Sequence, residues 1–341
     1  MSSGSDHLHA MPLRWLGALT PRARGVPGRV RALPLWFVLL MVGAAVRAPV
    51  FGNPVVHVDE EFYFTVARAM LDGALPYVDI WDRKPIGLFL LYVPAAALGY
   101  PTGIWAYQAM ALACAVATAG MIARIAARAG WERGAPFAAI AYLLWLNLLE
   151  GQGGQAPVFY NLPMVLAAAC IAPTRGGNPD ADTRFRRGVV AMLFVGLSLQ
   201  VKYSVVFEGL FFGLTLLWRE WRVERDPRRL CLRGCVWAGV AMAPTALAWA
   251  GYVLAGHGNA FVFANFTSIL ARKPDPVEEQ LANLGSILVL AGPLALLALV
   301  GLRRGLRVAQ THAVAGWTMA WLGVAALGLL AVCPYFDHYA L

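Results

Sequence analysis

Two carboxylates and a lysine in the first third of the chain are the residues best suited to chemistry. Asp59 and Glu60 stand in V-H-V-D-E-E-F-Y-F, and Lys84 follows in W-D-R-K-P-I-G. A carboxylate held beside a lipid interface is a well-oriented general base. A lysine offers a compact positive charge to a phosphate. This combination predicts proton transfer on an anionic substrate.

The acidic pair lies at the start of a predicted amphipathic helix. Polar residues recur along one helical face at i, i+4, i+7 and i+11, namely Glu61, Thr65, Arg68 and Asp72. Apolar residues on another face suit the acyl boundary of a membrane, and Gly73 marks the end of the helix. A purely structural alternative makes Asp59 the N-cap, with Glu60 meeting the helix dipole.

A second polar group precedes the apolar run 85–99. It comprises Asp79, Asp82, Arg83 and Lys84. Two cations at headgroup depth, followed by an apolar segment, suit a lipid-linked phosphate. The alternative is ordinary snorkelling of interfacial Lys and Arg side chains.

The elements that must position these residues are membrane helices. Of 341 residues, 59% are hydrophobic and 14% are charged, against roughly half and a quarter in soluble domains. The net charge of +9 could indicate nucleic acid, but the arginines flank long apolar segments. That distribution indicates membrane orientation and excludes nucleic acid as a partner.

Nine apolar segments predict an all-α polytopic protein of the cell (inner) membrane. They are 34–51, 103–123, 135–149, 158–173, 188–201, 203–218, 236–256, 284–302 and 313–333. If 85–99 lies in the interface or re-enters, one side receives 21 of the 28 Lys and Arg residues, as the positive-inside rule expects. We therefore predict a cytoplasmic basic tail (1–33), a membrane domain (34–341) and a long extracytoplasmic loop (52–102). A cleaved signal peptide is the alternative for the N-terminus.

Two motifs on that loop carry a family resemblance. H-x-D-E-x-x-Y-x-x-x-A-x-x-M-L-x-G-x-x-P-Y and W-D-x-K-P-x-G resemble those of integral-membrane GT-C glycosyltransferases. The similarity is to the polyprenyl-phosphate-dependent branch, which includes protein O-mannosyltransferases and lipid A aminoarabinose transferases. The resemblance implies a GT-C-like transmembrane helix bundle whose first loop carries juxtamembrane helices. It also implies inverting transfer of a sugar from a polyprenyl-phosphate donor to a hydroxyl of a lipid, glycan or protein acceptor outside the cytoplasm.

The same resemblance assigns roles to individual residues. Asp59 matches the catalytic aspartate and Glu60 its acidic neighbour, while Lys84 matches the residue that meets the donor phosphate. The other expected substrate-binding residues are Tyr63, Asp82, Arg83, Lys202 and His338. Lys202 closes G-L-S-L-Q-V-K, and His338 lies in P-Y-F-D-H-Y.

Departures from the family pattern bear on the substrate and on metals. Pro85 is followed by Ile86 rather than a second proline, and Arg83 stands where aminoarabinose-type members carry Glu. The second departure argues against an aminoarabinose substrate and against a metal bound at that position. A divalent ion at Glu60 stays open, and no other cofactor is implied. The run G-Q-G-G-Q-A-P at 151–157 is interpreted as a turn, because it lacks the Lys-Ser/Thr of a phosphate loop.

Two other function classes remain open. One is a transporter or flippase of lipid-linked saccharides, and the other is a non-catalytic GT-C relative. In the family pattern a further span follows P-Y-F-D-H-Y. We therefore expect the chain to be C-terminally incomplete and His338 to face the active-site cavity.

Overall fold

The computed structural model describes residues 33–173, 179–273, 275–332 and 335–341. The predicted cytoplasmic tail, 1–33, lies outside these residues except for Leu33. Within the described ranges the chain is helical and forms no strand. The all-α prediction is therefore confirmed for this part of the protein.

Each of the nine predicted spans coincides with a helix. These helices are α1 (Leu35–Arg47), α4 (Thr102–Ala129), α5 (Ala135–Leu148), α6 (Ala156–Ile171), α7 (Ala181–Leu199), α8 (Val206–Glu224), α9 (Pro227–Leu254), α12 (Val277–Leu306) and α13 (His312–Leu330). Four of the helices in the described ranges, α4, α9, α12 and α13, are long and apolar enough to cross a membrane. The helices are thus those of a membrane protein, whereas the number and direction of the crossings stay predictions.

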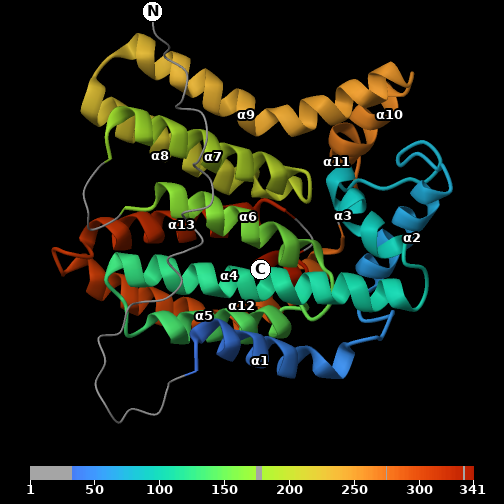
Figure 1. Ribbon diagram of the computed structural model, residues 1–341, viewed down its shortest axis with the longest axis horizontal. Helices are drawn as coiled ribbons and strands as arrows, with labels where there is room; N and C mark the ends of the chain where they lie inside the picture. Colours follow the sequence, from blue (N-terminus) through green and yellow to red (C-terminus); the bar gives the residue numbers. More distant parts are fainter. Residues whose placement is uncertain (1–32, 174–178, 274, 333–334) are drawn as a thin grey trace, which may run out of the picture. The chain divides into compact units, whose positions relative to one another are not determined.

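The predicted first loop folds into two further helices, α2 (Val58–Leu71) and α3 (Ile86–Ala96). Eleven residues rise only about 16 Å, roughly half the hydrocarbon thickness of a bilayer. This length fits the prediction that 85–99 lies at the interface or re-enters. In Figure 1, α2 and α3 lie together at the end of the bundle where α4 begins, and α3 packs against both α2 and α4.

Short elements complete the fold. They are η2 (Ala48–Val50), η3 (Tyr203–Val205), α10 (Gly258–Val262), the π-helix η4 (Phe263–Thr267), α11 (Ser268–Leu270) and η5 (Asp337–Ala340). Of these, η3 and η5 carry predicted site residues at or beside their ends, and η5 packs against α12.

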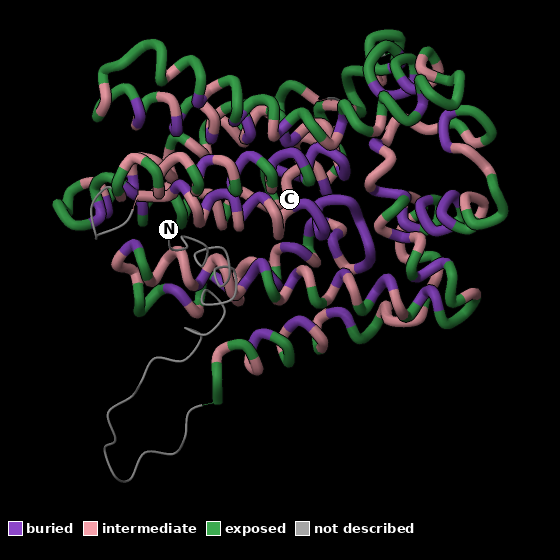
Figure 2. Tube along the Cα trace, turned by 45° about the horizontal axis from the view of Figure 1, so that its top comes forward, coloured by how far each residue is buried: buried purple, intermediate pink, exposed green. Residues whose placement is uncertain are grey.

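Small residues allow the central helices to approach closely. Ala111, Ala115 and Ala119 recur every four residues on α4 and are fully buried. Helices α1, α5 and α6 pack against α4, as expected where small side chains replace bulky ones at membrane helix contacts. Figure 2 shows the buried stretches running along the inner helices, while much of the outer surface is exposed.

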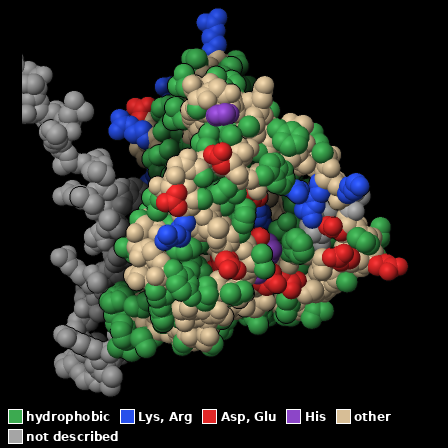
Figure 3. All heavy atoms as spheres, turned by 90° about the vertical axis from the view of Figure 1, so that its right-hand side faces the viewer, with side chains coloured by type: hydrophobic (Ala, Val, Ile, Leu, Met, Phe, Trp, Pro, Cys, Tyr) green, Lys and Arg blue, Asp and Glu red, His purple; other side chains and the backbone are tan. Residues whose placement is uncertain are grey.

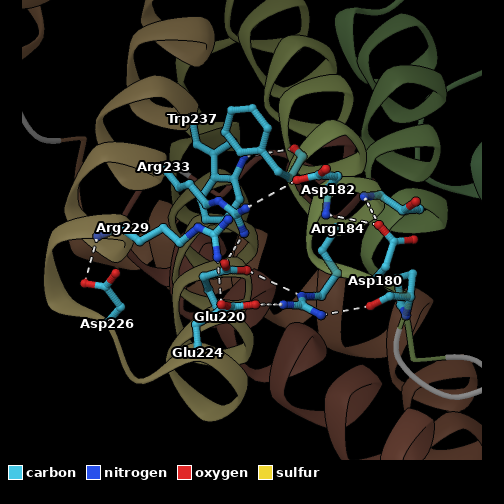
Figure 4. A network of polar contacts seen from close by, with 12 residues as sticks. Asp180, Asp182, Arg184, Glu220, Glu224, Asp226, Arg229, Arg233 and Trp237 are labelled. Carbon is cyan, nitrogen blue, oxygen red and sulfur yellow. Dashed lines mark hydrogen bonds and ion pairs between the residues drawn. The ribbon is translucent and has the colours of Figure 1, made fainter.

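The opposite end of the bundle carries a network of ion pairs (Figure 4). Glu220 on α8 is buried and accepts hydrogen bonds from Arg184 on α7 (3.4 Å) and from Arg233 on α9. Glu224 pairs with Arg184 at 3.1 Å and with Arg229 at 2.8 Å. The network ties three helix ends together where the sequence is rich in arginine.

Candidate functional site

Asp59 lies in the first turn of α2, but it is not the N-cap of that helix. The cap is His57, whose backbone is extended and whose Nδ1 accepts a hydrogen bond from the Asp59 amide at 3.3 Å. The N-cap alternative for Asp59 is therefore wrong. Because His57 caps the start of the helix, the Asp59 carboxylate is available for other partners.

The Asp59 carboxylate instead joins Tyr63 and Lys84 in a closed triangle. The Tyr63 hydroxyl donates to Asp59 Oδ2 at 3.1 Å. Lys84 Nζ donates to the Tyr63 hydroxyl at 3.0 Å and lies 3.4 Å from the same Asp59 oxygen. Tyr63 sits one helical turn after Asp59, and Lys84 reaches them from the segment before α3. The structure thus brings three of the predicted site residues into contact.

Opposing effects set the protonation of Asp59. Burial alone raises its pKa, but the charges of Lys84, His338 and His57, with the Tyr63 hydrogen bond, outweigh burial and leave the pKa below its ordinary value. Asp59 is therefore ionised at neutral pH and can accept a proton.

Glu60 points away from this triangle into the protein. Its side chain is fully buried, and its carboxylate accepts a hydrogen bond from the Gly154 amide. Burial raises the pKa of Glu60 to about 7, against the opposing effects of Gly154 and Arg47. These contacts position the 151–154 loop, and none of them is made with Lys84.

That glycine-rich loop is a turn, as predicted from the sequence. Arg47 of α1 donates to the carbonyl oxygens of Gly151 (2.5 Å), Gln152 (2.9 Å) and Gly153 (3.1 Å). A Cβ at Gly153 would collide with the Glu60 carboxyl group. The glycine is needed because the loop backbone lies directly against that side chain.

Asp82 and Arg83 flank the triangle without joining it. Asp82 Oδ1 accepts from the Arg83 amide at 2.5 Å, and burial raises the pKa of Asp82 despite the nearby Lys84 charge. The Arg83 guanidinium lies 5.5 Å from the ring centroid of Trp81. The predicted phosphate contact therefore rests on Lys84 rather than on Arg83.

Lys202 approaches the same region from the end of α7. Its Nζ lies 4.1 Å from the ring centroid of Tyr339. Burial, together with the positive charge of Lys84, lowers the pKa of Lys202 to about 7. A buried lysine whose protonation is disfavoured by a neighbouring positive charge marks a cationic site that an anion would stabilise.

His338 lies beside the triangle and joins two residues that the sequence interpretation missed. Its Nδ1 is 3.0 Å from Glu150 Oε2, and His57 Nε2 is 3.5 Å from the same oxygen. Glu150 follows an apolar segment on the predicted outer face, and that position is the signal from which the sequence could have indicated it. Figure 3 looks onto this end of the bundle, where acidic, basic and histidine side chains gather around a recess.

An apolar cavity of about 820 Å³ opens between α3, α6, α7 and α9. Its lining includes Ile86, Leu91, Phe159, Leu166, Leu197 and Leu247. Gly87 and Val201 also line it, so one end of the cavity adjoins the segments that carry Lys84 and Lys202. An elongated apolar group in this cavity would have its end near both lysines.

The chain matches no protein-family model, and it has no match among curated proteins or among solved structures.

Proposed function

We propose that this protein is a GT-C-like membrane glycosyltransferase. It would transfer a sugar from a polyprenyl-phosphate donor to an acceptor hydroxyl on the extracytoplasmic face, with inversion at the anomeric carbon. The observation that carries the proposal is the contact of Asp59, Tyr63 and Lys84 beside an apolar cavity. This contact supports the roles of Asp59 as a base and of Lys84 as a phosphate-binding cation, and the cavity offers space for a lipid tail.

Each part of the donor, namely the tail, the phosphate and the sugar, has its own place in this arrangement. The isoprenoid tail occupies the cavity between α3, α6, α7 and α9, whose walls are almost wholly apolar. The phosphate lies between Lys84 and Lys202, whose charges interact, and near Gly87 and Val201 of the cavity lining, which follow and precede these lysines in the chain. The sugar then projects toward Asp59, which Lys84 contacts directly.

The reaction requires one base and one stabilised leaving group. The acceptor oxygen attacks the anomeric carbon and forms the new glycosidic bond. The bond from that carbon to the phosphate oxygen breaks, and the phosphate departs with the electron pair. Asp59 takes the hydroxyl proton, and Lys84 balances the charge on the leaving phosphate. A phosphate of low pKa leaves without a general acid.

Donor binding would also strengthen the base. In the free protein the Lys84 charge helps to lower the pKa of Asp59. A phosphate that draws Lys84 toward itself weakens this effect, so the pKa of Asp59 rises. Asp59 then becomes a better proton acceptor only when the donor is in place.

The test is turnover of radiolabelled polyprenyl-phosphate sugars by the purified chain in lipid nanodiscs. We expect release of free polyprenyl phosphate together with transfer of the label to an acceptor. Asp59→Asn should lower this turnover by about 10² or more, the scale of a lost general base. Asp72→Asn is the matched control, because Asp72 is exposed at the other end of α2.

Two outcomes would overturn the proposal. Donor that binds and crosses the bilayer with its sugar–phosphate bond intact would indicate a transporter or flippase. Near-normal turnover in Asp59→Asn, in protein that still elutes as the wild type does, would remove Asp59 as the base.

A further inference from the structure

Three side chains from distant parts of the chain meet beside the glycosyl-transfer site. His57 precedes α2, Glu150 follows α5, and His338 lies in η5. One atom from each residue lies within 4.8 Å of the others. Two imidazoles and one carboxylate form a ligand set that proteins use for zinc, with a further position left for water or substrate.

The distances between these atoms suit a common metal ion. Glu150 Oε2 lies 3.5 Å from His57 Nε2 and 3.0 Å from His338 Nδ1. Zinc bonds of about 2.0–2.2 Å place neighbouring ligand atoms of a tetrahedron about 3.3–3.5 Å apart. Shifts of a few tenths of an ångström would therefore bring these two pairs to ligand spacing.

The protein holds the ligands in place before any ion binds. Glu150 has a φ of 65°, in the left-handed region that is strained for a residue with a side chain. Such strain marks functional constraint more often than chance. His338 is buried, and its Nδ1 lies 3.0 Å from Glu150 Oε2, so the imidazole is held against the carboxylate.

Access to the cluster comes through Glu150. Its side chain is 41% exposed, whereas those of His57 and His338 are 26% and 6% exposed. An ion can therefore enter from the aqueous side, and a further coordination position stays open in that direction. Ligands of two imidazoles and one carboxylate favour zinc and other transition ions over magnesium or calcium.

Metal binding changes one hydrogen bond. In the metal-free protein His57 Nδ1 accepts from the Asp59 amide, so the neutral ring carries its proton on Nε2. Ligation through Nε2 moves that proton to Nδ1 and removes a bond whose length, 3.3 Å, is already at the weak end.

We propose that His57, Glu150 and His338 form a site for a divalent transition-metal ion of the zinc type. This site goes beyond the transferase function and does not depend on it. The alternative is a metal-free cluster, in which the two imidazoles make hydrogen bonds with the Glu150 carboxylate.

The experiment measures binding of zinc to the full chain in detergent. A Cys231→Ser, Cys235→Ser background is used, because these exposed thiols lie four residues apart on α9 and could bind zinc themselves. After removal of metals with a chelator, we expect one zinc ion per chain by calorimetry. Cobalt in its place should give the visible spectrum of a four- or five-coordinate site without thiolate bands.

Single variants locate the ion. His57→Gln, Glu150→Gln and His338→Gln should each weaken zinc binding by at least about a hundredfold, since second-shell changes alone cost 10–100-fold. His257→Gln is the matched control, because His257 is an exposed histidine at the start of α10.

The proposal is wrong if the chain binds no stoichiometric zinc, or if the three variants bind it as tightly as His257→Gln does. The cobalt spectrum of the unmutated site decides the question even if a variant fails to fold. A protein that lacks transferase activity but binds zinc through these residues would leave this inference standing.

Discussion

The Lys84 ammonium group contacts the Asp59 carboxylate and the Tyr63 hydroxyl. Its ion pair with Asp59 is partly exposed, with 28% and 34% of the two side chains accessible. A pair of this kind contributes little to folding, about 0–1 kcal/mol. We therefore interpret Lys84 as a ligand-binding residue rather than a structural one.

Lys84→Ala should raise the KM for the polyprenyl-phosphate donor and lower kcat, by about tenfold or more in kcat/KM, because a cation at the leaving phosphate is lost. Arg68→Ala is the control, since Arg68 is an exposed cation on the same loop. The measurement is steady-state kinetics in nanodiscs. Equal losses in both variants would point to general surface electrostatics and contradict the assignment.

If Lys202 holds the donor phosphate as proposed, the donor affinity should depend on pH. Because the pKa of Lys202 is lowered to about 7, the side chain loses its charge as the pH rises from 6 to 8. A glycosyl phosphodiester keeps its negative charge over this range, so its binding should weaken by up to about tenfold as the pH rises. The KM for the donor, followed from pH 6 to 8.5, reports this change.

Lys202→Arg supplies the matched test, because arginine stays charged throughout that range. We expect its KM to be nearly independent of pH. A wild-type KM that is flat, or that falls as the pH rises, would show that Lys202 does not hold the phosphate.

Among the elements, α2 is the one that the sequence predicts most fully. The polar face with Glu61, Thr65 and Arg68 is exposed, and the helix ends just before Gly73. This success follows from local physics, since helical periodicity and stop signals lie within 15 residues. Whether α3 crosses the membrane or lies at its surface is not determined by its local sequence, and cysteine labelling tests it.

Cysteine labelling tests the placement of α3. In a chain with its five native cysteines replaced, Val78→Cys and Tyr100→Cys should both react with an impermeant reagent from outside, whereas Asp180→Cys should be protected. All three positions are exposed, so a lack of reaction reports the membrane rather than protein burial. Labelling of 78 and 100 from opposite sides would make 85–99 a true span and reverse the orientation of the helices that follow.

What the sequence could not predict are the contacts between elements far apart in the chain. Glu60 looks like a second catalytic acid beside Asp59, but successive residues on a helix point about 100° apart, and only the fold shows that Glu60 meets Gly154. Similarly, the position of Arg47 at the end of α1 suggests an interfacial cation. In the structure its side chain is buried and donates hydrogen bonds to the carbonyl oxygens of residues 151–153. Such partners lie about a hundred residues away.

At the scale of the whole molecule, the described helices have two chemically different ends. One end gathers Asp59, Lys84, Lys202 and His338. The other gathers the network around Glu220, which joins α7, α8 and α9. This polarity agrees with the predicted distribution of arginine across the membrane, and it separates the ion-pair network that joins the helices from the part that we propose binds ligand.

Glu220→Ala should destabilise the protein strongly, because Arg184 and Arg233 would lose their buried partner. Breaking a buried pair in this way costs about 3–5 kcal/mol in the free energy of unfolding. Asp182→Ala should cost no more than about 1 kcal/mol, since Asp182 is 79% exposed and lies 3.8 Å from Arg233. Unfolding in mixed detergent micelles, followed by circular dichroism, measures both. Similar values for the two variants would contradict a structural role for the network.

The contact between His338 and Glu150 spans 188 positions of the chain, and this separation has a consequence for biosynthesis. A ribosome delivers α2 and its acidic turn to the membrane long before it delivers η5. The early segments can form their local helices at once, but the contact between His338 and Glu150 can form only after η5 has been made. If the proposed sugar transfer requires His338, a nascent chain could not carry it out before that point.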